Sequence, residues 1–345
     1  MPIPLFRLFP LLALLALLAL LAACDDTADR LSALNGPTMG TTWSVKFTGT
    51  PTDGVPALRQ SIEAALEQVN ADMSTYREDA TISRFNRAEA GRAVTVSDDF
   101  ARVLNEALTI SEDTDGAYDV TIGPLVNLWG FGPDPERFEP PPQAEVDAAR
   151  ARVGWKKLTL NGDQLTQPGG VYLDLSSIAK GFAVDKVAGV MEQAGIRNYL
   201  VEIGGELRAS GGKPQGQPWR VAVERPIPGV RQMDKVIALR DLSIATSGDY
   251  RNFFEVDGKV YSHTIDPRTG YPVGHQLGSV TVLHSSCMVA DGLATALTVL
   301  GPEKGLAFAR ARELPVLFIV RGDDGPEEIM TDAFRRILEG EAGGN

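Results

Sequence analysis

Cysteine and histidine are both scarce in this chain of 345 residues, which has two cysteines and three histidines. Cys24 and Cys287 are far apart in the sequence, so the chain has no cysteine pair with the spacing of a zinc site. If Cys24 carries a lipid, Cys287 is the only thiol left, and no intrachain disulfide can form. We therefore expect Cys287 to be a small buried apolar residue rather than a reactive group.

Several common ligand-binding motifs are also missing. The sequence has no Gly-x4-Gly-Lys-Ser/Thr phosphate loop, no Gly-x-Gly-x-x-Gly after a strand and no His-Glu-x-x-His. Basic residues are outnumbered, because 33 Lys and Arg stand against 45 Asp and Glu, which gives a net charge of −12. A protein with this charge is not attracted to nucleic acid or to an anionic lipid surface. Its partners are therefore expected among small molecules and proteins.

The N-terminal segment has the pattern of a secretory signal. Arg7 precedes an apolar run from Leu11 to Leu21, and the run closes on LAAC, which ends at Cys24. The run is too short to span a hydrocarbon core of about 30 Å, so a cleaved signal over residues 1–23 with a lipidated Cys24 is favoured over a transmembrane anchor. Asp25 resembles the inner-membrane retention signal of bacterial lipoproteins. These features predict a lipid-anchored protein on the periplasmic side of the inner membrane.

The remaining chain is predicted to form a tether over residues 24–36 and a single domain over residues 37–341. Strand-like alternation or helical spacing of apolar residues marks the expected elements. Strands are predicted at 41–48, 199–203, 207–210, 219–224, 236–239, 278–283 and 315–320, hairpins at 157–165 with 171–175 and at 251–265, and helices at 57–69, 100–114, 144–151 and 332–338. This mixture of helices with many hairpins predicts an α+β fold with a mostly antiparallel sheet.

Two stretches carry groups suited to catalysis. VYSHTIDPRTGYPV holds His263, whose imidazole suits proton transfer near neutral pH, although a structural role for this histidine stays open from the residues alone. VADGLATALTVL holds Asp291 and Thr295, whose spacing places both oxygens on one face of a helix. Such hard oxygen ligands favour Mg²⁺ or Ca²⁺ over zinc. One carboxylate is too few for tight binding, so we expect a phosphate-bearing substrate to complete the site.

Three further segments each allow two interpretations. Residues 73–86 are polar and form either a solvated loop or part of a site. Residues 116–132 combine glycines with aromatic rings, which suits a ligand wall or a packed loop. In the segment DLSSIAKGFAVD, Ser176 or Ser177 can cap a helix, and Lys180 would lie in its first turns, where either a bound anion or chance surface placement would explain it.

Eight short motifs, taken together, resemble the ApbE family of FAD:protein FMN transferases. They follow one another from about Pro37 to Leu300: PTMGT, MSTYREDATISRFN, YDVTIGPLVNLWGFG, DLSSIAKGFAVD, IGGELRASG, TSGDYRNFFE, YSHTIDPRTGYPV and ADGLATAL. The sequence departs from the family pattern at Tyr118, where phenylalanine is common, at Ser177, where alanine is frequent, and at Thr264, where isoleucine is usual. None of these departures changes a side chain that we expect to do chemistry.

The resemblance implies a T-fold-like body, FAD as the donor, and a Ser or Thr hydroxyl of another protein as the acceptor. The product is a phosphoester-linked FMN, and AMP is the leaving group. By similarity, His263 is the general base. The implied FAD contacts are Met39, Tyr76, Ala117, Tyr118, Asp119, Asp174, Lys180 and Ile265. The implied cation ligands are Asp291, Thr295 and the backbone carbonyls of Ser177 and Ala294, with Mg²⁺ expected and Ca²⁺ or Mn²⁺ as alternatives.

Other functions fit the same residues. An FAD pyrophosphatase would use water in place of the acceptor hydroxyl, and a flavin-binding lipoprotein would bind without turnover. A solute-binding lipoprotein would fit the predicted periplasmic location, but this function gives no reason for the His263 and Asp291 motifs. The acceptors are expected among flavoprotein subunits of membrane redox complexes. Asp266 and Arg268, close to the histidine, are expected to shape a turn rather than to catalyse.

Overall fold

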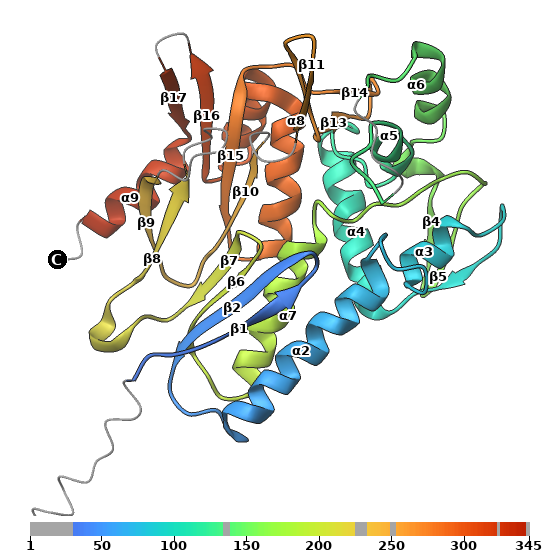
Figure 1. Cartoon of the computed structure of the whole chain (residues 1–345). Coiled ribbons are helices and arrows are strands. Elements are labelled where there is room, and N and C mark those ends of the chain that lie inside the picture. The colour runs from blue at the N-terminus through green and yellow to red at the C-terminus, as the bar shows by residue number, and fades with distance from the viewer. Residues whose placement is uncertain (1–29, 134–138, 225–232, 249–252, 323–324, 343–345) are drawn as a thin grey trace, which may run out of the picture.

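The computed structural model describes residues 30–133, 139–224, 233–248, 253–322 and 325–342. A large sheet runs through it, and each pair of neighbouring strands is antiparallel (Figure 1). In spatial order its strands are β1 (Ser32–Thr38), β2 (Thr41–Thr48), β6 (Asn198–Ile203), β7 (Glu206–Ser210), β10 (Ser243–Gly248), β15 (Leu277–His284), β16 (Val316–Gly322) and β17 (Gly325–Met330). The expected α+β class with a mostly antiparallel sheet is confirmed.

Helices cover one face of this sheet. They are α2 (Gly54–Met73), α4 (Asp98–Asp113), α7 (Ala179–Gln193) and α8 (Cys287–Ala311). Helix α8 packs on β10 and β15, α7 packs on α8 and β6, and α2 packs on α7. The apolar stripe predicted for α2 is buried at Leu58, Ile62, Ala65, Leu66 and Val69. An amphipathic helix therefore lies where its spacing requires, with its apolar side on the core.

The other face of the sheet is covered by the hairpin of β8 (Trp219–Glu224) and β9 (Met233–Leu239) and by α9 (Asp332–Ala342). Strand β16 explains why both faces need a cover. Its Phe318 packs in the core on the helical side, whereas Leu317 and Ile319 pack with Trp219 in a second core. Successive side chains of a strand point to opposite faces, so an unbroken apolar strand is stable only between two layers.

A smaller lobe lies beside the main sheet and its helices (Figure 1). Its elements are α3 (Thr81–Asn86), α5 (Gly123–Leu128), α6 (Gln143–Arg150), the three-stranded sheet of β3 (Val94–Thr95), β5 (Gln164–Thr166) and β4 (Thr159–Asn161), and the hairpins of β11 (Phe253–Val256) with β12 (Lys259–Ser262) and of β13 (Ile265–Asp266) with β14 (Tyr271–Pro272). Short 3-10 helices are η3 (Trp155–Lys157) and η4 (Pro214–Gly216). The predicted hairpin at Asp257-Gly258 is confirmed, because both residues adopt the positive φ that a two-residue turn needs.

Three expectations about the elements are corrected. The tether predicted to reach residue 36 stops earlier, because Ser32–Thr38 form strand β1 in register with β2. The polar loop predicted at 73–86 contains α3, whose Ile82 and Phe85 are buried in the core. The strand predicted at 171–175 does not form a hairpin with β5, which pairs with β4 instead. Tyr172 forms an isolated β-bridge to Ile122.

Strand β17 was missed from the sequence. Its residues are mostly exposed and polar at the edge of the sheet, so no apolar alternation marks it. The predicted signal at residues 1–23 and the lipidated Cys24 lie outside the described residues. Within the described part of the chain, no helix combines the length and the apolar character needed to cross a membrane.

Candidate active site

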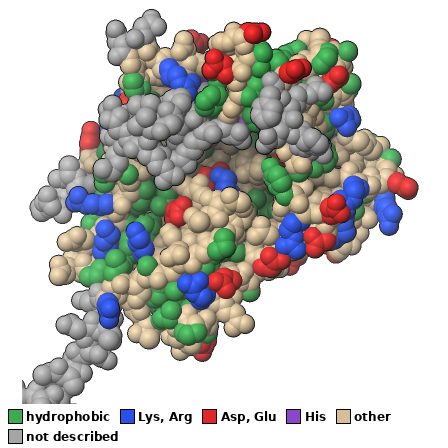
Figure 2. Space-filling model, viewed as in Figure 1, with side chains coloured by type: hydrophobic (Ala, Val, Ile, Leu, Met, Phe, Trp, Pro, Cys, Tyr) green, Lys and Arg blue, Asp and Glu red, His purple; other side chains and the backbone are tan. Residues whose placement is uncertain are grey.

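A cavity of about 530 Å³ lies between α7, α8 and the smaller lobe. Figure 2 shows the surface hollowed at this face, with acidic and basic side chains inside the hollow. The predicted site residues that line the cavity are Met39, Tyr76, Ala117, Tyr118, Asp119, Asp174, Ser177, Lys180, His263, Ile265, Asp291 and Thr295. Segments that are far apart in the sequence, from residue 39 to residue 295, therefore meet at one site.

One predicted site residue does not reach the cavity. Ala294 is 1% exposed and is not among the residues that line it. Its carbonyl oxygen lies within α8 and accepts a hydrogen bond from the Thr298 hydroxyl at 2.8 Å. The helical amide four residues on also uses this oxygen, so the arrangement gives no support to Ala294 as a cation ligand.

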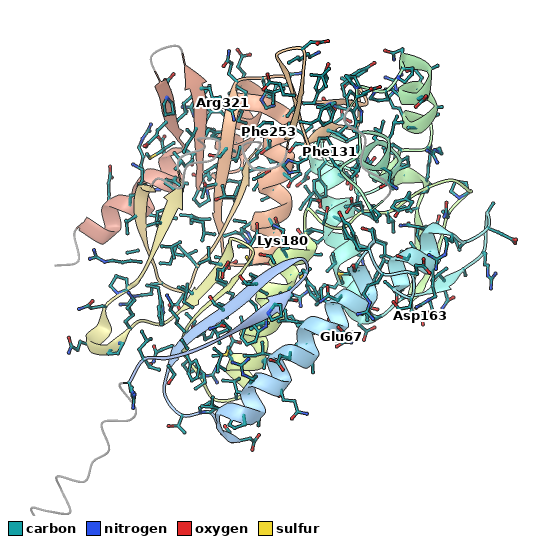
Figure 3. The ribbon with its side chains drawn as sticks, viewed as in Figure 1. Glu67, Phe131, Asp163, Lys180, Phe253 and Arg321 are labelled. Carbon is teal, nitrogen blue, oxygen red and sulfur yellow. The ribbon has the colours of Figure 1, made fainter. Side chains whose placement is uncertain are left out.

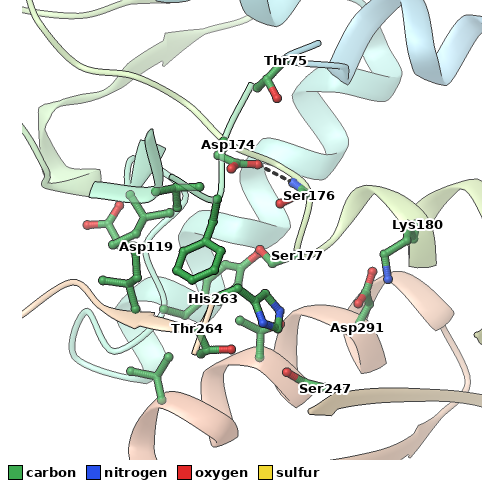
Figure 4. Close-up of a pocket in the computed structure, with 18 of the residues that line it drawn as sticks. Thr75, Asp119, Asp174, Ser176, Ser177, Lys180, Ser247, His263, Thr264 and Asp291 are labelled. Atoms are coloured by element: carbon green, nitrogen blue, oxygen red, sulfur yellow. Dashed lines mark hydrogen bonds between the residues drawn. The ribbon is translucent and has the colours of Figure 1, made fainter. Parts of the chain in front are cut away.

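Three charged side chains form the centre of the site. Lys180 lies in the first turn of α7, Glu206 begins β7, and Asp291 lies in the second turn of α8. The Lys180 Nζ donates to Glu206 Oε1 at 2.6 Å, and Figure 4 shows the Lys180 ammonium beside the Asp291 carboxylate. Figure 3 places Lys180 in the space between the sheet and the smaller lobe. The anion expected near Lys180 is thus supplied, at least in part, by the chain itself.

Burial shapes the ionisation of this cluster. Desolvation raises the pKa of Asp291 to about 7, and Glu206 adds to the rise while Lys180 opposes it. Desolvation also raises the pKa of Glu206. For Lys180, burial alone lowers the pKa, but the charges of Asp291 and Glu206 outweigh it and raise the pKa above its usual value. Lys180 is therefore a fixed positive charge near neutral pH.

The position of Asp291 depends on close packing between α7 and α8. The amide of Gly181 donates to Asp291 Oδ2 at 2.9 Å. A Cβ placed on Gly181 would lie 2.3 Å from the carbonyl oxygen of Cys287 and 2.7 Å from the Cβ of Asp291. Only glycine allows the two helices to approach this closely, and the approach holds the carboxylate at the cavity wall.

Asp185 holds the N-terminus of α8. Its carboxylate accepts hydrogen bonds from the Ser286 hydroxyl at 2.7 Å and from the amides of Cys287 and Met288 at 3.1 and 3.0 Å. Arg208 pairs with the same carboxylate at 2.7 Å. An acidic group is favourable at a helix N-terminus, where the first amides lack helical partners. Asp185 on α7 thus fixes the helix that carries Asp291 and Thr295. Cys287 is fully buried there, as predicted.

A column of aromatic rings leads to His263, which follows β12 directly. Phe131 meets the His263 ring edge-on at 6.3 Å between centroids. Phe131 stacks on Phe254 at 5.6 Å, Phe254 stacks on Tyr261 at 5.1 Å, and Tyr261 stacks on Trp129 at 5.6 Å. These stacked rings join β11 and β12 to α5 and so set the position of the histidine. The aromatic segment at 116–132 therefore both packs the lobe and lines the cavity.

Asp266 and Arg268 shape the turn after His263. The Arg268 guanidinium donates from Nε and Nη2 to the two oxygens of Asp266 at 2.9 and 2.8 Å. The amide of Gly270 donates to the Asp266 carbonyl at 2.8 Å, and Trp129 Nε1 donates to the Gly270 carbonyl at 2.9 Å. The structural role predicted for Asp266 and Arg268 is confirmed.

Asp119 and Asp174, two other acids predicted to contact FAD, accept hydrogen bonds from nearby residues of the chain. Asp119 Oδ1 accepts from the amide and hydroxyl of Thr121, and its Oδ2 accepts from the Trp155 amide at 3.0 Å. Asp174 Oδ1 accepts from the Ser176 amide at 2.9 Å, so Asp174 orders the turn before α7. The predicted serine cap of α7 is not formed, because no side chain caps this helix. Both acids still face the cavity, where their contact with FAD stays a prediction.

Tyr118 and Ser177 contact each other. Their hydroxyl oxygens lie 2.9 Å apart, and Tyr118 is 3% exposed. These are two of the three positions at which the sequence departs from the family pattern. In the sequence the two departures lie 59 positions apart, whereas in the fold the two hydroxyls form one hydrogen-bonded pair.

The cavity suits a divalent cation only in part. Asp291 and Thr295, one helical turn apart on α8, both face it with oxygen donors. Within the described ranges, no group of three or more His, Cys, Asp or Glu side chains could hold a metal ion. A cation at this site would therefore need further oxygens from a phosphorylated substrate, as expected from its single carboxylate.

Three residues that matter at the site were not predicted from the sequence. Glu206 stood within the IGGELRASG motif, Gly181 within DLSSIAKGFAVD and Phe131 within YDVTIGPLVNLWGFG. An acidic residue directly after a strand and a glycine turn was the available signal for Glu206. The contact partner of Gly181 lies more than a hundred residues away, so no local signal could have found it.

The fold and cavity define an α+β protein in which His263 and the α8 residues Asp291 and Thr295 face one ligand-sized cavity. The model of the ApbE family matches residues 39–318, and the chain belongs to this family. A protein from Vibrio cholerae named FAD:protein FMN transferase is 47% identical over 319 residues, which cover 91% of this chain and 95% of that relative.

Solved structures agree with this assignment. The flavin transferase ApbE from Vibrio cholerae has 47% identity and a TM-score of 0.83, and the match covers 89% of this chain and 98% of that one. The flavinyl transferase ApbE of Pseudomonas stutzeri, in its apo form, has 44% identity and a TM-score of 0.84, with 91% and 98% covered.

Proposed function

We propose that this chain transfers FMN from FAD to a Ser or Thr hydroxyl of an acceptor protein and releases AMP. The observation that carries the proposal is the meeting of His263, Lys180 and Asp291 in one cavity of a member of the ApbE family. These groups supply a proton acceptor, a fixed positive charge and a cation ligand. A phosphoryl transfer needs these three functions and no nucleophile from the enzyme itself.

The reaction breaks one bond and forms another. The acceptor oxygen forms a bond to the phosphorus on the FMN side of the diphosphate, and the bond from this phosphorus to the oxygen of AMP breaks. His263 takes the proton of the acceptor hydroxyl, a contribution typically worth on the order of 10²–10⁴ in rate. Lys180 lies where it can offset negative charge that builds on the diphosphate.

A divalent cation would neutralise further charge on the diphosphate oxygens. The residues that would hold it are Asp291 and Thr295, together with the Ser177 carbonyl. Mg²⁺ is favoured because it keeps few protein ligands and takes others from substrate phosphates. Ca²⁺ and Mn²⁺ are the alternatives.

The cellular location of the protein is also a proposal. The LAAC sequence at residues 21–24 and the acidic residues after it support lipidation of Cys24 and attachment to the periplasmic side of an inner membrane. Flavoprotein subunits of membrane redox complexes would be accessible from there. Mass analysis of the mature N-terminus would test this, and an unprocessed Met1 in the membrane fraction would contradict it.

The transferase reaction is tested by incubating the purified protein with FAD, Mg²⁺ and a panel of candidate acceptor domains. Intact mass of each acceptor should increase by one FMN, in equal amount to the AMP released. His263→Ala should still bind FAD but lose transfer. Free FMN and AMP with no flavin on any acceptor would instead establish the pyrophosphatase reaction.

A further inference from the structure

Glu206 is a buried acid for which the proposed mechanism has no role. Its residue is 3% exposed, and it begins β7 after the Gly204-Gly205 turn. One oxygen, Oε1, accepts from Lys180 at 2.6 Å, whereas Oε2 is buried without a hydrogen-bond partner among the described residues. A buried carboxylate oxygen without a partner is unfavourable, so its retention at the wall of a ligand cavity needs an explanation.

The cluster holds one ammonium group for two carboxylates. Lys180 pairs directly with Glu206, and its charge also acts on Asp291. For Asp291 itself, the described hydrogen bond comes from the uncharged amide of Gly181 at 2.9 Å. An ammonium and a divalent cation compete for the same carboxylate, because both are attracted by its charge. Whichever acid holds Lys180 therefore decides how freely Asp291 can bind a cation.

We propose that Glu206 is a positioning residue that engages the Lys180 ammonium in a direct ion pair and so keeps Lys180, which lies beside Asp291, from pairing directly with the carboxylate that binds the divalent cation. With Glu206 present, one ammonium and two carboxylates leave a net charge of −1 in the cluster, which attracts a cation. Without the charge of Glu206, the net charge falls to zero and the flexible Lys180 side chain turns to Asp291. The inference rests on the proposed function, because it presumes the cation site at Asp291.

The test measures cation binding directly and without turnover. Free Mn²⁺ is followed by its electron paramagnetic resonance signal during titration of the full chain, without FAD and then with it. Glu206→Gln keeps the shape of the side chain and removes the charge, and we expect Mn²⁺ affinity to fall about 10-fold or more. Circular dichroism and the melting temperature of each variant show whether it is folded.

Two further variants separate this role from a structural one. Glu202→Gln is the matched control, because Glu202 lies on the neighbouring strand β6 and its oxygens accept from Ser44 and Gly205 outside the cavity. It should bind Mn²⁺ like the unchanged protein. The double variant Lys180→Met with Glu206→Gln removes the competing ammonium and restores a net charge of −1, so its Mn²⁺ affinity should return toward that of the unchanged protein.

The outcomes are distinguishable. Equal Mn²⁺ affinity of the unchanged protein and Glu206→Gln would overturn the inference alone and leave the proposed function intact. Weak binding by Glu206→Gln that the double variant does not restore would also overturn it. A protein that binds no Mn²⁺ even with FAD present would overturn both the cation site of the proposed function and this inference.

Discussion

The hydrogen bond between Tyr118 and Ser177 gives a prediction that can be measured as one coupling energy. The Tyr118 ring is buried, and burial raises the pKa of its hydroxyl, so this group stays protonated and depends on Ser177 as its partner. Ser177→Ala leaves the buried hydroxyl unpaired, which costs about 1–3 kcal/mol of the free energy of unfolding. Tyr118→Phe leaves the half-buried Ser177 hydroxyl, which water can reach, so we expect a loss of about 1 kcal/mol or less.

The double variant Tyr118→Phe with Ser177→Ala removes both hydroxyls and should be nearly as stable as the unchanged protein. The magnitude of the coupling energy of the cycle then equals the sum of the two single losses, about 1–4 kcal/mol. Urea unfolding of the four proteins, with equal slopes, provides the assay. If the two single losses simply add in the double variant, the two hydroxyls are independent and the reasoning fails.

Three other predictions follow from the site. His263→Ala should lower the transfer rate roughly 10²-fold or more while FAD binding, followed by flavin fluorescence, is retained; unchanged transfer would exclude His263 as the base. Gly181→Ala should push α8 away from α7, lower the free energy of unfolding by roughly 1–3 kcal/mol and weaken cation binding. Gly189→Ala is the control, because Gly189 lies on the same helix and a Cβ there meets no atom within 4 Å. For Asp291, the pKa of about 7 in the folded protein lies above the ordinary aspartate value of 3.8. Its contribution to stability is therefore complete below about pH 4 and is lost as the pH rises to about 7. In the presence of a chelator, the stability difference between the unchanged protein and Asp291→Asn should therefore change over this range, and parallel curves would contradict the shifted pKa.

The elements predicted well are those whose apolar spacing directly reports a buried face. Helix α2 and strand β2 lie where the pattern placed them, and the unbroken apolar run of β16 is sandwiched between two cores. Strand β17 and helix α3 were missed for opposite reasons. Strand β17 pairs through its backbone while its side chains stay in water, and α3 is a single short helix inside a polar segment.

The sequence alone determined the fold class, the ApbE resemblance and a set of candidate site residues, nearly all of which line the cavity, because short motifs and apolar periods are local properties of a chain. Tertiary structure alone decided which of these side chains act on one another. It paired Lys180 with Glu206, joined Tyr118 to Ser177, and brought the Gly181 amide to Asp291 across 110 positions. Ala294, a predicted cation ligand, is buried and is not among the residues that line the cavity. Such contacts depend on how helices and strands pack in space, and neither the spacing nor the composition of a single segment carries that information.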